Sequence, residues 1–263
     1  MNQYDAIVVG AGHNGLTNGA YLAKAGLKVA VLERNPYIGG ATVSRELHKG
    51  WYYSNCSYVS SLLRPEITRD LELPRHGLQV VPFGGGATFM RNGDHFGSYS
   101  DHDRHYREIA RHSKRDANAY DRYAADTSLQ TKLIRPYLMR TPPDPTSLKP
   151  RDLRDLMEFA QSFMSLGEEK LLDTIKFWTA SVGDYLNEYF ETDVIKAHMA
   201  GSGIIGTALG VYSPGTAYVL LHHYMGDVDG NVGAWGFARG GMGAIDSALS
   251  KSFLSFGGEI ICD

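Results

Sequence analysis

The sequence predicts an α/β fold built around a parallel β-sheet, and three features of the first 33 residues support this prediction. An apolar run at Ala6–Val9 is followed by a glycine-rich turn at Gly10–Gly15 and by a second apolar run at Val29–Leu32. Continuous apolar runs are typical of central parallel strands that are covered on both faces. The residues between the turn and the second run predict a helix that ends near Ala25, so residues 4–33 form a βαβ unit.

The predicted helix has one apolar face. Leu16, Ala20, Ala23 and Leu27 follow one another at spacings of three and four residues, which places them on the same side of a helix. We therefore expect this stripe to lie on the sheet.

The turn between the first strand and the helix has the pattern GxGxxG. Its residues are Gly10, Ala11, Gly12, His13, Asn14 and Gly15. The first glycine allows a tight turn, the second lets the backbone approach a diphosphate, and the third lets the helix pack closely on the strand. The free amides and the positive end of the helix dipole then face the phosphates. A strand before this pattern and a helix after it indicate a Rossmann-like dinucleotide-binding domain.

Glu33 closes the second strand, 18 residues after Gly15. A carboxylate at this place can accept hydrogen bonds from ribose hydroxyls, and it would repel a 2′-phosphate. The agreement of turn, helix, strand and acid favours a bound dinucleotide over a glycine-rich turn without a ligand.

The residues after Glu33 resemble the large flavoprotein family that includes amine oxidases and phytoene desaturases. The resembling run is Glu33-Arg34-Asn35-Pro36-Tyr37-Ile38-Gly39-Gly40-Ala41-Thr42. The resemblance implies that the cofactor is FAD. It also implies that Arg34 flanks the adenosine end, and that Gly39, Gly40, Ala41 and Thr42 lead toward the flavin.

Further blocks resemble a phytoene-desaturase-like subgroup called pyridine nucleotide-disulphide oxidoreductase domain-containing protein 2. The blocks are residues 51–54, 60–67, 70–73, 76–78 and 233–243. The resemblance implies an FAD-dependent oxidoreductase that removes a hydride from a small organic substrate, and an apolar substrate is left open. Members of the family run to roughly twice this length, so we expect the C-terminal half of the family fold to be absent here.

The rest of the chain predicts an inserted, mostly helical region. Arg91–Asp94 reads as the turn of a hairpin, residues 101–141 as polar helices, and the prolines of 142–150 as a surface loop. Residues 151–200 predict amphipathic helices with one apolar face. That face is formed by Leu171, Ile175, Trp178, Val182, Tyr185 and Tyr189.

A helix after Gly240–Gly243 and a strand at Glu259–Cys262 return to the first domain. We therefore expect an FAD-binding domain at 1–85 and 236–263, with a substrate region at 86–235 between its two parts.

Composition argues against several other classes of protein. A net charge of −3 gives no field that would attract nucleic acid. No apolar run reaches the roughly 20 residues that span a bilayer, although peripheral membrane contact stays open. Only five residues precede Ala6, so we expect no presequence and a cytoplasmic protein. Cys56 and Cys262 form neither a CxxC pair nor a metal-ligand pattern, so we expect no metal site.

The other sequence features give weaker indications of function. The second GxGxxG pattern, Gly201–Gly206, follows a predicted helix instead of a strand, so we interpret it as a connection in the substrate region. We expect Cys56 to be a buried structural thiol, with a place near the flavin as the alternative. No residue stands out as a catalytic acid, base or nucleophile, which is compatible with flavin chemistry. The alternatives to an oxidoreductase are a non-enzymatic binding protein that resembles Rab GDP-dissociation inhibitors, and an inactive truncated relative.

Overall fold

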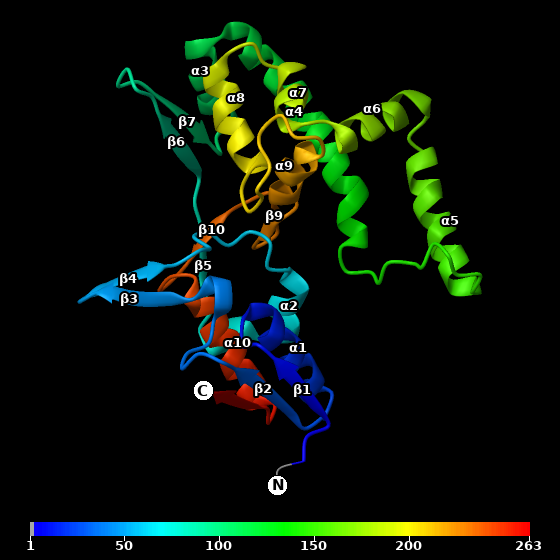
Figure 1. The fold of residues 1–263 in the computed structure, drawn as a ribbon. Helices are drawn as coiled ribbons and strands as arrows, with labels where there is room; N and C mark the ends of the chain where they lie inside the picture. Colours follow the sequence, from blue (N-terminus) through cyan, green and yellow to red (C-terminus); the bar gives the residue numbers. More distant parts are fainter. Residues whose placement is uncertain (1–2) are drawn as a thin grey trace. The chain divides into compact units, whose positions relative to one another are not determined.

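The computed structural model describes residues 3–263, which form two compact units. Unit 1 contains the chain up to Phe83 together with Gly226–Asp263, and unit 2 is Gly84–Met225 (Figure 1). The return to the first unit therefore comes ten residues earlier than the expected boundary, after Met225 instead of Trp235. The reason is a close contact with Ser61, whose carbonyl accepts a hydrogen bond from the Asp227 amide at 2.9 Å.

Unit 1 combines a small parallel sheet with two long helices and several short strands. Its strands are β1 (Ala6–Val9), β2 (Val29–Glu33), β3 (Ser44–His48), β4 (Trp51–Ser54), β5 (Val80–Pro82), β8 (Asp227–Val228), β9 (Asn231–Val232), β10 (Gly236–Ala238) and β11 (Glu259–Cys262). Its helices are α1 (His13–Lys24), α2 (Pro65–Asp70) and α10 (Gly243–Ser255), with the 3₁₀ turns η1 (Gly40–Thr42) and η2 (Leu73–His76).

The parallel sheet has the strand order β1-β2-β11 (Figure 1). Ala6 of β1 pairs with Val29 of β2, and Ile260 of β11 pairs with Val31 of β2, both in parallel register. Parallel neighbours need a crossover, and α1 supplies it between β1 and β2. The structure therefore confirms the predicted βαβ unit and the strand expected at Glu259–Cys262, and it places that strand beside β2.

The core of unit 1 lies where α1 and α10 pack together on one face of this sheet. Leu16, Ala20 and Phe253 are fully buried there. Val31 and Phe253 close in on Gly19, where a Cβ would lie 2.9 Å from Val31, so α1 can sit this close only because residue 19 has no side chain. The apolar stripe predicted for α1 is correct as far as Ala23.

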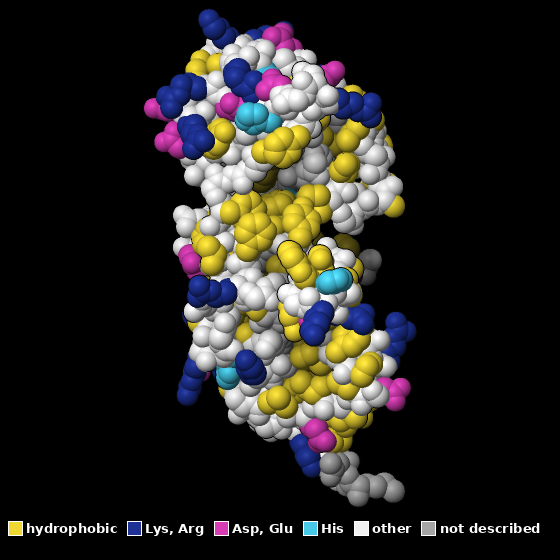
Figure 2. Space-filling view, turned by 90° about the vertical axis from the view of Figure 1, so that its left-hand side faces the viewer, with side chains coloured by type: hydrophobic (Ala, Val, Ile, Leu, Met, Phe, Trp, Pro, Cys, Tyr) yellow, Lys and Arg dark blue, Asp and Glu magenta, His cyan; other side chains and the backbone are white. Residues whose placement is uncertain are grey.

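Two expectations for this core are wrong. Leu27 lies beyond the end of α1 and is 40% exposed. Ile7 and Val9 of β1 are 60% and 86% exposed, so β1 is not covered on both faces. Alternate side chains of a strand point to opposite faces, and α1 and α10 cover only one of them. Figure 2 shows hydrophobic side chains gathered on the surface of this unit.

Unit 2 is mostly helical, as expected. Its helices are α3 (His102–His112), α4 (Lys114–Ile134), α5 (Pro150–Met164), α6 (Glu168–Thr179), α7 (Val182–Asn187), α8 (Asp193–Ala200) and α9 (Thr216–Tyr224), with the 3₁₀ turns η3 (Arg135–Tyr137) and η4 (Gly201–Gly203). The predicted hairpin is present as β6 (Gly85–Phe89) and β7 (His95–Tyr99). Within residues 3–263, no helix is both long enough and apolar enough to cross a membrane.

The amphipathic region of unit 2 differs from its prediction in two ways. Pro150 is the first residue of α5 and not part of the preceding loop, because a proline fits the first turn of a helix. The predicted apolar face over Leu171–Tyr189 is divided between α6 and α7, since Ser181 caps the start of a new helix, and Tyr189 lies beyond the end of α7. Ile175 is 53% exposed, while Phe177 faces the core instead.

Three histidine rings surround the buried side chain of Phe96. The rings of His198, His112 and His105 have centroids 4.8, 5.7 and 6.1 Å from that of Phe96. Nδ1 of His198 lies 2.8 Å from the Thr88 hydroxyl, which ties α8 to the hairpin. Burial lowers the pKa of His198 and, together with the charge of His198, that of His105. Their surroundings therefore favour the neutral form of His198 and His105.

We expect unit 2 to lose stability as the pH falls. A histidine whose pKa is lowered in the folded state favours folding above its unfolded value, here 6.5, and this contribution is lost on acidification. The substitution His198→Gln keeps a hydrogen-bonding side chain beside Thr88 and should reduce the slope of stability against pH. His102→Gln should increase it, because Asp121 raises the pKa of the exposed His102. Thermal unfolding between about pH 5 and pH 8 measures the slopes, and equal slopes for wild type and His198→Gln would contradict this account.

Candidate functional site: the two glycine turns of unit 1

The first glycine turn connects the end of β1 to the start of α1. Gly10 has φ +100°, which a side chain rarely tolerates, and its amide donates to the Leu32 carbonyl at 2.7 Å. A Cβ on Gly15 would lie 2.0 Å from the Gly10 carbonyl oxygen, so the helix starts in direct contact with the turn. Gly12 is the N-cap residue of α1, so the helix has no side-chain cap, and its first turn contains no acid. Its first amides can therefore face an anion.

The second glycine turn lies directly against the first. The Gly39 amide donates to the Ala11 carbonyl at 3.0 Å, and Gly12 and Gly39 form an isolated parallel bridge. Gly39 and Gly40 have φ +124° and +52°. A Cβ on Gly40 would lie 3.2 Å from the Gly12 Cα, so this close approach favours a residue without a side chain at position 40. Residues from the two ends of the predicted site are thus brought together.

Glu33 stands at the end of β2 and is already hydrogen-bonded to the chain. Its Oε2 accepts from the Ala11 amide at 2.9 Å, and its Oε1 accepts from the Asn35 amide at 3.0 Å. These bonds, that of Ala11 first, lower the pKa of the Glu33 carboxyl. Oε1 also accepts from the side-chain amide of Asn35 at 2.6 Å, whereas Oε2 keeps a second acceptor position, so a ribose hydroxyl can still bind at Oε2. Glu33 therefore has two possible roles, to fix the turn and to hold a ribose.

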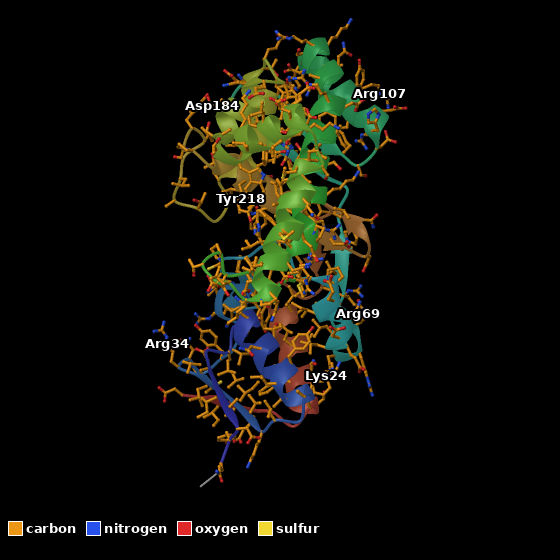
Figure 3. All side chains as sticks on the ribbon, turned by 90° about the vertical axis from the view of Figure 1, so that its right-hand side faces the viewer. Lys24, Arg34, Arg69, Arg107, Asp184 and Tyr218 are labelled. Atoms are coloured by element: carbon orange, nitrogen blue, oxygen red, sulfur yellow. The ribbon has the colours of Figure 1, made fainter. Side chains whose placement is uncertain are left out.

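The other predicted site residues fall into two groups. Ala11 and Thr42 are buried, and the half-buried His13 has an Nδ1 atom that is buried without a hydrogen-bond partner. Asn14, Arg34, Gly40 and Ala41 are exposed. Figure 3 shows Arg34 at the outer edge of unit 1. The site is therefore lined by backbone on one side and exposed on the other.

Sequence reasoning missed Asp246, which joins the second glycine turn from α10. Its side chain is 1% exposed, and its Oδ2 is hydrogen-bonded to the Thr42 hydroxyl. Burial raises the pKa of Asp246 to about 6. The available signal was the single acid of α10, but an acid near the start of a helix is ordinarily explained by the helix dipole.

The other sequence features considered above are weaker candidates for a ligand site. Cys56 is exposed, so the expectation of a buried thiol is wrong. Gly201–Gly206 follows α8 and begins as the 3₁₀ turn η4, without the strand that a dinucleotide-binding turn needs. Residues 3–263 contain no group of three or more histidine, cysteine or acidic side chains placed to hold a metal ion.

The geometry of the two turns fits a dinucleotide. A Cβ at Gly12 would meet only Gly40 at 3.7 Å, so the space beside this glycine is left by the fold and would be reduced by any side chain. Uncapped helix amides lie at one end and the Glu33 carboxylate at the other. This donor and acceptor set matches a diphosphate followed by a ribose.

Comparison with known proteins gives the same result for the fold. Residues 8–70 match the model of the NAD(P)-binding Rossmann-like domain. Putrescine oxidase has a similar structure with a TM-score of 0.56, over 99% of this chain and 50% of the oxidase, at 17% sequence identity. Protein PF1083 of Pyrococcus furiosus is similar with a TM-score of 0.55, over 97% of this chain and 50% of that protein, at 16% identity. At these identities the likeness shows the fold alone.

Sequence relatives extend over nearly the whole chain. The chain is 36% identical to mouse pyridine nucleotide-disulfide oxidoreductase domain-containing protein 2, over 99% of this chain and 47% of the relative. It is 30% identical to an uncharacterized protein of Mycobacterium bovis, over 98% of this chain and 47% of that protein. A component of the limonene dehydrogenase of Castellaniella defragrans is 36% identical over 46% of this chain and 22% of the relative. The chain spans about half the length of the curated relatives that it matches over nearly its whole length.

The two glycines of the first turn should respond differently to substitution by alanine. In Gly15→Ala the new Cβ overlaps the Gly10 carbonyl, and such overpacking should reduce the free energy of unfolding by about 1–3 kcal/mol. In Gly12→Ala the Cβ has room and φ is −77°, so stability should change by less than about 0.5 kcal/mol while dinucleotide binding weakens. Urea unfolding and FAD titration of both variants test this contrast. Undiminished FAD binding by a folded Gly12→Ala variant would exclude a diphosphate at this turn.

Proposed function

Since the chain is similar along 99% of its length to pyridine nucleotide-disulfide oxidoreductase domain-containing protein 2, we propose that it is an FAD-dependent oxidoreductase. The observation that carries the proposal is the contact between the two glycine turns, with the Gly39 amide bound to the Ala11 carbonyl at 3.0 Å. One glycine turn suffices for any dinucleotide. A second one, packed on the first, continues the backbone surface beyond the diphosphate, as expected for a cofactor that extends toward a flavin.

Each part of this site has a separate task in the proposed complex. The uncapped amides at the start of α1 bind the diphosphate, since they are backbone donors at the positive end of a helix. Glu33 accepts hydrogen bonds from the adenosine ribose. Its lowered pKa keeps it charged at neutral pH, so it also disfavours a cofactor with a 2′-phosphate. Arg34 flanks the adenosine, and Gly39–Thr42 leads toward the flavin.

The proposed reaction is the removal of a hydride and a proton from a small organic substrate. Bound FAD supplies a ring that accepts two electrons as a hydride. Unit 1 would bind the cofactor and unit 2 the substrate. The similarity to a component of a limonene dehydrogenase supports an apolar substrate, because limonene is a hydrocarbon. With such a substrate, the protein's part is to orient it and to exclude water, without a strong acid or base.

Titration calorimetry of the 263-residue chain tests the cofactor. We expect FAD to bind more tightly than NAD, because only FAD extends over the second glycine turn. Arg104→Ala, which changes an exposed side chain of α3 in unit 2, serves as a control that should bind both cofactors as wild type does. Tight binding of NAD together with no binding of FAD would refute the proposal.

Glu33→Ala should weaken FAD binding by roughly tenfold to a hundredfold, because a hydrogen bond to a charged group contributes about 1.5–3 kcal/mol. Glu33→Gln is the matched variant, since its amide oxygen can still accept from the Ala11 amide at similar geometry. Binding that is lost in Glu33→Ala and restored in Glu33→Gln shows that a neutral acceptor at this position is enough, and a loss in both variants shows that the charged carboxylate is needed. Dissociation constants equal to that of wild type in both variants would remove Glu33 from the cofactor site.

A further inference from the structure

Asp246 is a buried acid that has no role in the proposed function. It lies in the first part of α10, and it contacts the second glycine turn 204 positions away through Thr42. A Cβ on Gly39 would lie 3.3 Å from its Oδ2, so the carboxyl group packs directly against this turn. Its other oxygen, Oδ1, is buried without a hydrogen-bond partner.

The hydrogen bonds around Thr42 indicate where the proton of this pair is. The Thr42 hydroxyl has one hydrogen but two close acceptors, the Gly39 carbonyl at 2.8 Å and Asp246 Oδ2. If Asp246 were ionised, one of these contacts would place two oxygen atoms together without a hydrogen between them. A protonated Asp246 removes the conflict, because it donates to Thr42, and Thr42 then donates to Gly39.

The surroundings of Asp246 favour the same protonation state. Burial is the largest cause of its raised pKa, and only the Thr42 hydroxyl and its own amide act in the opposite direction. The amides of Met242 and Gly243, at the start of α10, donate to the hydroxyls of Ser54 and Ser44 at 3.1 and 3.0 Å instead.

The elements packed against α10 are α1, η1, η2 and β11. Their titratable and charged side chains are His13, Tyr21 and Lys24 of α1, Arg75 and His76 of η2, and Glu259 and Cys262 of β11. Lys251 and Asp246 are those of α10 itself. No charged side chain is among the causes that shift the pKa of Asp246.

We propose that Asp246 is a positioning residue that carries a proton when the cofactor is bound, and that binding of the FAD diphosphate draws this proton onto its carboxyl group. The inference rests on the proposed FAD function. In its neutral form Asp246 holds Thr42 and, through it, the Gly39 carbonyl, which fixes the second glycine turn against the first. In its ionised form it places a negative charge beneath the second turn, which packs on the turn that would bind the diphosphate, and like charges at short range repel in a water-poor environment.

FAD titrations over a range of pH test this linkage with the variant Asp246→Asn. The asparagine amide donates to Thr42 as the protonated acid does, but it cannot ionise. For wild type we expect the dissociation constant to rise with pH above about 6, by up to tenfold per unit, and for the variant to stay constant. Calorimetry at about pH 7.5 in two buffers of different ionisation enthalpy should show close to one proton taken up by wild type and none by the variant. Equal proton uptake in both proteins would overturn the proposal.

The stability of the cofactor-free proteins separates this inference from the proposed function. A carboxyl whose pKa is raised from 3.8 to about 6 stabilises the folded state below the lower value and loses this contribution as pH rises through the higher one. Wild type and Asp246→Asn should therefore unfold alike near pH 4, and the variant should be the more stable one above pH 7. Thr42→Ser keeps the hydroxyl and should retain the wild-type profile. If neither protein binds FAD at any pH, the FAD proposal and the linkage both fail, while parallel stability profiles overturn the protonation of Asp246 itself.

Discussion

The amide of Gly39 reaches the carbonyl of Ala11 at 3.0 Å, and this bond between two turns governs the arrangement of the candidate site. A Cβ on Gly40 would lie 3.2 Å from the Gly12 Cα, so a side chain at Gly40 would need a shift of backbone. The contact also fixes the direction of the chain after β2, so that Thr42 is buried and meets Asp246 of α10. The end of β1, the segment after β2 and the start of α10 are therefore one connected structure, although they come from distant parts of the sequence.

Much of unit 1 could be predicted because its signals are local. Each glycine of Gly10–Gly15 and the acid at Glu33 lie within one βαβ unit, where the period of apolar residues and the type of turn residue are directly readable. The β6–β7 hairpin was predictable for the same reason, since its turn residues stand between two short strands. Local patterns do not state which face of a strand will be covered, so the exposure of Ile7 and Val9 could not be derived from an apolar run alone.

What the sequence did not reveal depends on contacts between distant segments. Thr42 and Asp246 are 204 positions apart, and neither residue has a pattern that names the other. The return of the chain to unit 1 after Met225 depends on a fit to Ser61, which no periodicity reports. The break between α6 and α7 was missed because the apolar spacing continues across it, whereas the cap at Ser181 decides where the new helix starts.

Two carboxyl groups flank the paired turns, and their environments shift their pKa values in opposite directions. Glu33 accepts backbone hydrogen bonds at a partly open strand end, which stabilises its charge, while Asp246 is buried beside a hydroxyl, which disfavours charge. A site for a diphosphate tolerates a negative charge only where hydroxyl groups bind, and this is the end at which Glu33 stands. An acid under the second turn is compatible with an anionic ligand only in its neutral form. The difference in burial therefore makes Asp246 the acid that takes up a proton, and under the proposed linkage the cofactor-bound site has one negative charge instead of two.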